Sequence, residues 1–121
     1  MGFDYFYGLQ ADQFSFIRLP KLLMTQKEYA ELSTEAKLLY GLLLDRMGES
    51  RKNKWLDDQG RVFIVYPIAE IQETMGISKK KAMADLAELE THGLIVRKHR
   101  GNGRTDMIYV MNLTEIGRAH V

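Results

Sequence analysis

Apolar positions at helical spacing predict the longest element of the chain, a helix over residues 34–47. Its stripe consists of Ala36, Leu39, Leu43 and Met47. Ser33 precedes the stripe and suits an N-cap, because its hydroxyl can accept a hydrogen bond from a backbone N–H of the first turn. Gly48 follows the stripe and suits a helix end. Further leucines widen the stripe, so we expect this helix to be central and buried on more than one side.

Two shorter helical stripes follow later in the chain and lie close together. They consist of Ile68, Ile71 and Met75, and then of Ala82, Leu86 and Leu89. Gly76 suits the end of the first helix, Ser78 suits the N-cap of the second, and Gly93 suits its end. Two helices joined by a short turn that contains glycine are typical of a helix-turn-helix motif.

Strands are predicted on both sides of this helix pair. Residues 62–66 form a continuous run of β-branched and aromatic residues, which indicates a buried strand. Residues 94–98 and 107–111 predict two more strands, and the glycine- and asparagine-containing segment between them predicts a β-hairpin. Apolar residues also alternate over 14–19, which predicts a short N-terminal strand, whereas the mostly polar residues 48–60 predict a loop.

These elements predict an α+β fold in which a β-hairpin directly follows a helix-turn-helix, the arrangement called a winged helix. The strand before the helix-turn-helix and the two hairpin strands would form a small antiparallel sheet, with an extra N-terminal strand or arm. We divide the chain into an N-terminal arm over 1–13, a winged-helix domain over 14–113, and a C-terminal tail or start of a linker over 114–121.

Composition narrows the classes of function. The 121 residues include no cysteine, which excludes a disulfide scaffold, a thiolate zinc site and a cysteine nucleophile, and which suits a reducing cytoplasm. The longest apolar runs are far shorter than the ~20 residues that a membrane span needs. The three histidines have no carboxylate or cysteine beside them at ligand spacing. We therefore expect no membrane segment, no metal, no cofactor and no enzymatic activity.

The formal net charge of +1 hides an uneven distribution. Residues 78–104 hold seven basic and three acidic side chains, a net charge of +4, while the rest of the chain has a net charge of −3. The positive stretch coincides with the second helix of the predicted helix-turn-helix and with the hairpin. A local basic surplus is the usual electrostatic footprint of nucleic-acid binding.

The basic residues occupy the positions at which a winged helix contacts DNA. The second helix of the motif enters the major groove with its first turns facing the bases, and small residues at the hairpin tip let the backbone approach a phosphate. We predict DNA contacts from Ser78, Lys79, Lys80, Lys81, Met83, Arg97, Arg100, Asn102, Arg104 and Thr105. The alternatives are that the lysine run is only a solvated helix start, or that the contact face includes Arg51, Lys52 and Lys54.

The N-terminal region is rich in aromatic residues. They are Phe3, Tyr5, Phe6, Tyr7, Phe14 and Phe16. This density exceeds what a disordered arm carries, which indicates a dimer contact. The alternative is that these side chains close the core of their own domain.

Two resemblances add to these inferences. Residues 76–111 resemble the general winged-helix pattern of bacterial regulators such as the GntR class, through Leu86, Leu89, Glu90, Gly93, Leu94 and Ile95. Residues 16–112 more narrowly resemble the N-terminal domain of the RepA-type plasmid replication initiators of Gram-positive bacteria, the RepA_N family. The stretches that carry this second resemblance are 16–21, 32–33, 35–47, Ser50, Asn53, Trp55, Asp57, 60–62, 93–95 and 109–110.

The narrower resemblance implies a replication initiator that binds repeated double-stranded DNA sites within its own coding region, as a homodimer that recruits other replication proteins. The helix over 78–92 would lie in the major groove and the wing over 99–106 on the flanking backbone. Two alternatives stay open: a winged-helix transcriptional regulator, and a winged-helix module of the replication machinery that binds protein. The last would bind DNA weakly and without salt dependence.

Overall fold

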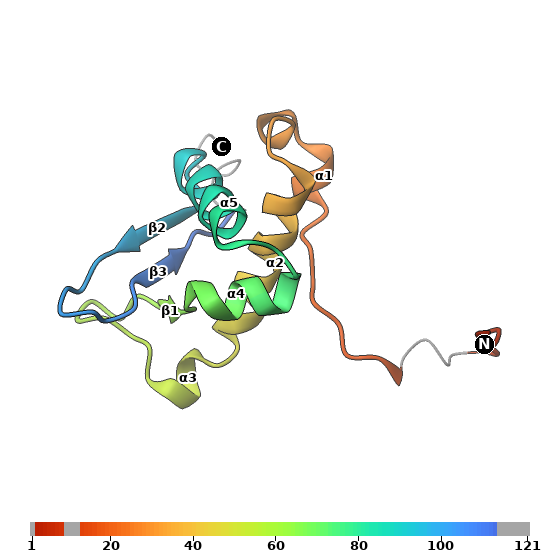
Figure 1. The fold of residues 1–121 in the computed structure, drawn as a ribbon, viewed down its shortest axis with the longest axis horizontal. Helices are drawn as coiled ribbons and strands as arrows, with labels where there is room; N and C mark the ends of the chain where they lie inside the picture. The colour runs from red at the N-terminus through yellow and green to blue at the C-terminus, as the bar shows by residue number, and fades with distance from the viewer. Residues whose placement is uncertain (1, 9–12, 114–121) are drawn as a thin grey trace.

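The structure is a computed structural model that describes residues 2–8 and 13–113 (Figure 1). Helices and strands follow the order expected for a winged helix. They are α1 (Leu22–Thr25), η2 (Lys27–Tyr29), α2 (Thr34–Met47), α3 (Ser50–Asn53), β1 (Ile64–Val65), α4 (Ile68–Met75), α5 (Lys79–Thr91), β2 (Ile95–Lys98) and β3 (Met107–Val110). The predicted tail over 114–121 lies outside the described residues.

The sheet is antiparallel and has three strands in the order β1-β3-β2. Ile108 of the central strand is paired with Ile64 on one side and with Arg97 on the other. The strand before the helix pair and the two wing strands therefore form one sheet, as predicted. This confirms the α+β winged-helix fold.

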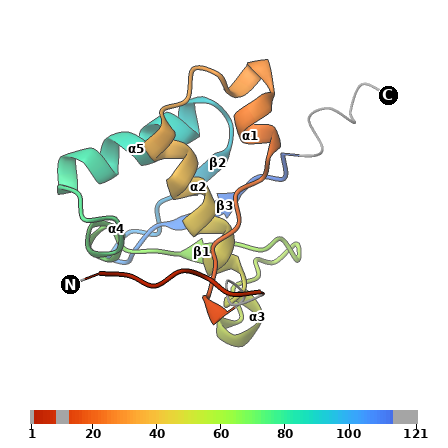
Figure 2. The same ribbon diagram turned by 90° about the vertical axis from the view of Figure 1, so that its right-hand side faces the viewer.

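Helix α2 forms the centre of the domain. It packs against α5, β1 and β3, and Figure 2 shows it between α1 on one side and α5 on the other. Its buried residues are Ala36, Leu39, Tyr40, Gly41 and Leu43. The expectation of a helix buried on more than one side is confirmed.

The helix ends are set by the residues that the sequence indicated. Ser33 Oγ accepts a hydrogen bond from Ala36 N at 3.1 Å, and Ser78 Oγ accepts one from Lys81 N at 3.1 Å. Gly76 adopts a left-handed φ of 67° and closes α4. At the end of α5 the backbone N–H groups of Gly93 and Leu94 donate to the carbonyls of Glu90 and Leu89, which is the hydrogen-bond pattern of a Schellman motif.

The predicted strand over 14–19 is wrong. The segment is extended but pairs with no strand among the described residues, and it leads away from the body of the domain (Figure 1). Phe14 and Phe16 on one side of it are 52% and 65% exposed, and Ile17 and Leu19 on the other are both 38% exposed. The alternating pattern therefore belongs to an arm rather than to a strand.

The segment 48–60 also departs from the prediction of a loop. Residues Ser50–Asn53 form the one-turn helix α3, and Trp55 N closes it by donating to Ser50 O at 2.8 Å. Trp55 itself is half-buried and packs against the core. The following strand is shorter than the predicted 62–66, because only Ile64–Val65 pair with β3 and Val62 makes an isolated bridge with Leu56.

Candidate nucleic-acid interface

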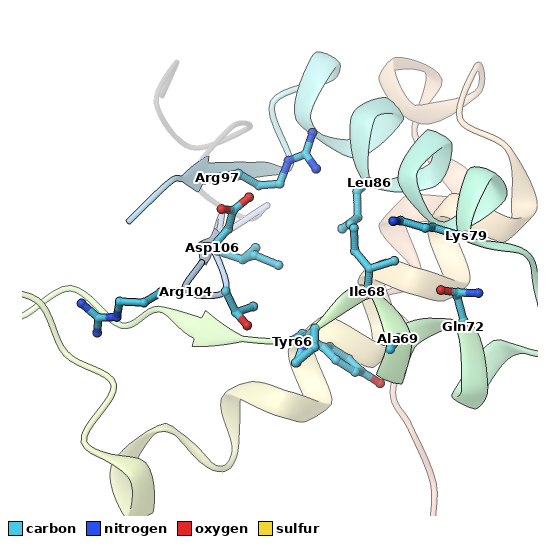
Figure 3. Close-up of a pocket in the computed structure, with 12 residues that line it drawn as sticks. Tyr66, Ile68, Ala69, Gln72, Lys79, Leu86, Arg97, Arg104 and Asp106 are labelled. Atoms are coloured by element: carbon cyan, nitrogen blue, oxygen red, sulfur yellow. The ribbon is translucent and has the colours of Figure 1, made fainter. Parts of the chain in front are cut away.

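A groove of about 400 Å³ lies where α4, the start of α5 and the wing meet (Figure 3). Its floor is formed by apolar and aromatic side chains and its rim is polar. The lining residues are Tyr66, Pro67, Ile68, Ala69, Gln72, Lys79, Leu86, Arg97, Arg104, Thr105, Asp106 and Ile108. The groove thus joins the two elements, recognition helix and wing, that the sequence analysis placed on DNA.

Lys79 and Arg104 are the exposed cations of this groove, and they come from opposite sides of it. In Figure 3 Lys79 of α5 lies near Ile68, whereas the Arg104 side chain points outward from the wing, away from the other labelled residues. Arg97 also lines the groove, but its guanidinium is paired with Glu90 at 2.8 Å. Asp106 contributes a carboxylate that is paired with His99 at 2.7 Å. The available positive charge therefore comes from Lys79 on α5 and from Arg104 at the outer side of the wing.

The first two turns of α5 present Lys79, Lys80, Lys81 and Met83 to solvent. Met83 is 46% exposed, which keeps it on the outer face as predicted. Lys81 differs from its two neighbours, because its Nζ lies 3.3 Å from Glu35 Oε1 on α2 and 3.3 Å from Asp85 Oδ1 on α5. Of the three lysines that the sequence predicts to contact DNA, Lys81 is therefore the one that lies beside carboxylates.

Asp85 contacts Lys81 and was not among the residues predicted from the sequence. It is fully buried on the core face of α5. Burial raises the pKa of Asp85 to about 6, and the neighbouring Glu35 acts in the same direction while Lys81 opposes it. Its position was visible in the sequence, because it lies three residues after Ala82 and four before Leu89, at the spacing of the apolar stripe.

The wing tip is a compact glycine turn. Gly101, Asn102 and Gly103 all have positive φ angles, of 73°, 52° and 71°. Arg100 folds back along the wing, since its Nε donates to Thr105 O at 2.8 Å. Asn102 and Arg104 are exposed. The predicted wing residues are thus brought together at one tip, with Arg100 bracing the turn.

The outer base of the wing is fixed by Asp57. Its carboxylate accepts hydrogen bonds from Arg61 Nε at 2.7 Å and from the Tyr109 hydroxyl at 2.9 Å, as well as from the backbone N–H groups of Gln59 and Arg61. Although burial raises the pKa of Asp57, these hydrogen bonds outweigh it and hold the pKa well below its usual range. The network ties the turn before β1 to the central strand of the wing.

The alternative basic residues lie on a different element. Arg51, Lys52 and Lys54 are exposed on and just after α3. Figure 1 shows α3 on one side of α4 and α5 on the other. These residues do not line the groove.

The predicted dimer residues are exposed. Phe3 is 97% and Tyr5 83% exposed. Phe14 makes edge-to-face contacts with Phe6 and Phe16 at centroid distances of 6.1 and 6.5 Å. The aromatic side chains therefore contact one another, and the alternative that they close the core of their own domain is wrong.

Comparison with known proteins shows which family has this architecture. The family described as "Replication initiator protein A (RepA) N-terminus" matches residues 15–120. The chain belongs to this family. The RepA resemblance predicted from the sequence is thus confirmed, and the match includes the winged helix and its wing.

This RepA-family domain also matches another protein over part of its length. It is similar to the "41 kDa protein" of Lactobacillus helveticus, at 29% identity over 80 residues. That alignment covers 66% of this chain but only 23% of the relative, so the chain spans about a quarter of that protein's length.

Solved structures show the same fold. The chain is similar to a structure described as "Structure of Rep-DNA complex", with a TM-score of 0.76 at 27% identity, covering 97% of this chain and 95% of the other. It is also similar to one described as "N-Terminal domain of DNA binding protein", with a TM-score of 0.75 at 26% identity and the same coverages. A third, described as "Structure of MDR initiator", has a TM-score of 0.73 at 27% identity, covering 97% of this chain and 99% of the other.

Among the described residues no helix is long and apolar enough to cross a bilayer. Within the same residues, no three histidine, cysteine, aspartate or glutamate side chains gather as a metal site would require.

Proposed function

We propose that this chain is the DNA-binding domain of a plasmid-type replication initiator, which binds double-stranded DNA with α5 in the major groove and the wing on the flanking backbone. The observation that carries the proposal is the groove that is lined by Lys79 of α5 and by Arg104 of the wing. One of the similar structures is described as a Rep–DNA complex, and this chain matches it over 97% of its length.

The start of α5 suits contact with bases and with phosphates. Lys79, Lys80 and Met83 are exposed on its first turns, and the first turn of any helix leaves backbone N–H groups for an anion. Lysine binds phosphate as a mobile point charge, whereas arginine offers a planar fork of donors. Lys79 and Lys80 would therefore contact phosphates along the DNA major groove. Met83 would contact an apolar base edge such as a thymine methyl.

The wing suits contact with the flanking backbone. Asn102 and Arg104 are exposed at the tip, and the glycines beside Asn102 carry no side chain to keep a phosphate away. Arg97, Arg100 and Thr105 complete the predicted wing set. Arg97 and Arg100 already donate to Glu90 and to Thr105 O, so we assign them to positioning the wing and Arg104 to the phosphate.

Such a domain acts without catalysis, because it positions DNA for other replication proteins in the cytoplasm. The sites it recognises would be repeats within the initiator's own coding region. Its net surplus of four positive charges over 78–104 is modest, so tight binding requires two copies that act together.

We infer that the second copy is recruited through the aromatic arm. The arm exposes Phe3, Tyr5, Phe6 and Tyr7 by 60% or more of their surface. Exposed apolar surface of this kind marks interaction sites in soluble proteins. A homodimer would place two recognition helices on neighbouring repeats.

The test is binding of the 121-residue chain to two DNA duplexes over a salt series. One duplex carries the direct repeats of its own coding region and the other is the same sequence scrambled. Specific recognition predicts that the repeats are bound roughly 10³-fold more tightly or better. Equal affinity for the two duplexes at every salt concentration would remove the initiator function, and weak binding without salt dependence would favour the protein-binding alternative.

A further inference from the structure

Lys81 sits between two carboxyl groups that belong to different helices. Its Nζ lies 3.3 Å from Glu35 Oε1 of α2 and 3.3 Å from Asp85 Oδ1 of its own helix α5. Glu35 is the first-turn acid of α2, and Asp85 is one turn beyond Lys81. The three side chains form a carboxylate–lysine cluster at the junction of the central helix and the recognition helix.

This cluster is short of positive charge. Asp85 is fully buried. Glu35 Oε1 and both Asp85 oxygens are shielded from solvent, and Lys81 is the only cation paired with them among the described residues. One ammonium group therefore has to compensate two carboxylates, in a place where an unpaired charge is costly.

We propose that Glu35 and Asp85 are positioning residues that hold Lys81 back from DNA, and that uptake of one proton by the carboxyl pair releases Lys81 to bind a phosphate. This inference rests on the proposed function, because it assumes that α5 meets DNA. On this proposal Lys79 and Lys80 face DNA at any pH, whereas Lys81 does so only when the carboxyl pair is protonated.

The charged groups around Asp85 support this assignment. Burial and the neighbouring Glu35 together raise the pKa of Asp85 to about 6, against the opposing effect of Lys81. A side-chain hydrogen bond with Asp85 is the largest cause that lowers the pKa of Glu35, and Lys81 acts in the same direction. The pair thus takes up a proton on Asp85 near pH 6, and Lys81 then loses one of its two anionic partners.

Other elements packed against α5 place no competing charge on this cluster. They are α4 and β2 as well as α2. On α4, Glu70 is paired with Arg46, and Glu73 is exposed. On β2, Arg97 is paired with Glu90, and Lys98 is exposed. Glu88, one turn further along α5, is bonded to Ser33.

The experiment measures how the DNA affinity of the whole chain depends on salt, at pH 8 and at pH 5, with the repeat duplex as probe. Log affinity falls as log salt concentration rises, and each phosphate neutralised by a cation makes this fall steeper by about 0.9; the slope below means the size of this fall. We expect Lys81→Ala to leave the slope unchanged at pH 8 and to lower it by about 0.9 at pH 5. The matched variant Lys79→Ala should lower the slope at both pH values.

A double-mutant cycle separates the release of Lys81 from the loss of a nearby negative charge. Asp85→Asn removes one anionic partner and is expected to raise the slope at pH 8 by about 0.9 when Lys81 is present, and to do nothing in the Lys81→Ala background. An equal effect of Asp85→Asn in both backgrounds would overturn the proposal. The proposal would also be overturned if, at pH 8, Lys81→Ala reduced the slope as much as Lys79→Ala does.

Two further measurements keep the test independent of folding and of the proposed function. Glu35→Gln removes the other anionic partner of Lys81. It should have the same effect on the slope as Asp85→Asn and replaces that variant if Asp85→Asn fails to fold.

NMR titration of the side-chain carboxyl carbons and of Lys81 Nζ in the DNA-free protein should show both groups responding together near pH 6. An unresponsive Lys81 Nζ would overturn the cluster even if DNA binding holds, and a response without any DNA binding would leave the cluster intact while the proposed function fails. The comparison with Lys81→Ala cancels the contribution of other titrating groups.

Discussion

Glu88 of α5 binds Ser33, the residue that caps α2, through both of its carboxylate oxygens. One oxygen accepts from the Ser33 backbone N–H at 2.5 Å, and the other accepts from the Ser33 hydroxyl at 2.9 Å. The same hydroxyl accepts from Ala36 N. These hydrogen bonds join helix α5 to the N-terminus of the central helix α2, the end that also carries Glu35.

Glu88→Ala is expected to destabilise the domain. The substitution leaves the half-buried N–H and hydroxyl of Ser33 without their acceptor, which costs about 1–3 kcal/mol. Urea unfolding followed by circular dichroism measures the change in the free energy of unfolding. Glu73→Ala, at an exposed acid of α4, is the control and should have little effect. If Glu88→Ala had the same free energy of unfolding as Glu73→Ala, the Glu88–Ser33 hydrogen bonds would contribute nothing to stability.

The turn of the helix-turn-helix depends on Gly76. Its φ of 67° lies in the left-handed region, where a side chain costs roughly 1–2 kcal/mol. Gly76→Ala should lower the free energy of unfolding by about this amount, and Gly76→Asn by less, since asparagine tolerates this conformation better. Thermal unfolding compares the two variants. Equal melting temperatures for the wild type and Gly76→Ala would contradict the conformation described for this turn.

Asp57 should make the domain sensitive to acid. Burial raises its pKa in the folded chain, but hydrogen bonds from Arg61 and Tyr109 outweigh burial, so the net shift of the pKa is downward. The stability that it contributes is therefore fully present above the unfolded pKa of about 3.9 and is lost as the pH falls below it. Urea unfolding at pH 7 and at pH 3 should show a loss for the wild type and a smaller loss for Asp57→Asn. A loss of the same size in both proteins would assign the acid sensitivity to other carboxylates.

The aromatic arm should determine the oligomeric state. Sedimentation of the full chain should give the mass of a dimer at concentrations where a variant lacking residues 1–13 gives that of a monomer. Replacing Phe3, Phe6 and Phe14 by serine in the full-length chain should have the same effect, because it removes apolar surface and keeps the length. Unchanged mass in both variants would move the dimer contact elsewhere or remove it.

The sequence predicted those parts of the fold that short-range chemistry determines. Ser33 and Ser78 cap helices, and Gly76 and Gly93 end them, through hydrogen bonds and φ angles that involve only nearby residues. The strand over 14–19 was wrong for the opposite reason. Alternation shows which side chains share a face, but a strand also needs a neighbouring strand to pair with, and none lies beside this segment among the described residues.

The candidate site was predictable in outline and not in detail. The order of helix pair and wing placed Lys79 and Arg104 on one surface. The capture of Lys81 depends on Glu35, a residue of another helix far away in the sequence, so no local pattern could reveal it. Asp85 was recognisable from its place in the apolar stripe, because a charged residue at a core position requires a partner.

The central claim is that DNA lies across the groove between α5 and the wing. The most direct test is the salt dependence of DNA affinity for the wild type, Lys79→Ala, Arg104→Ala and Lys52→Ala. We predict that Lys79→Ala and Arg104→Ala each reduce the slope by about 0.9 and weaken binding to all sequences alike, while Lys52→Ala on α3 leaves the slope unchanged. A reduced slope for Lys52→Ala, with unchanged slopes for Lys79→Ala and Arg104→Ala, would contradict the claim and place DNA on the α3 side of the domain.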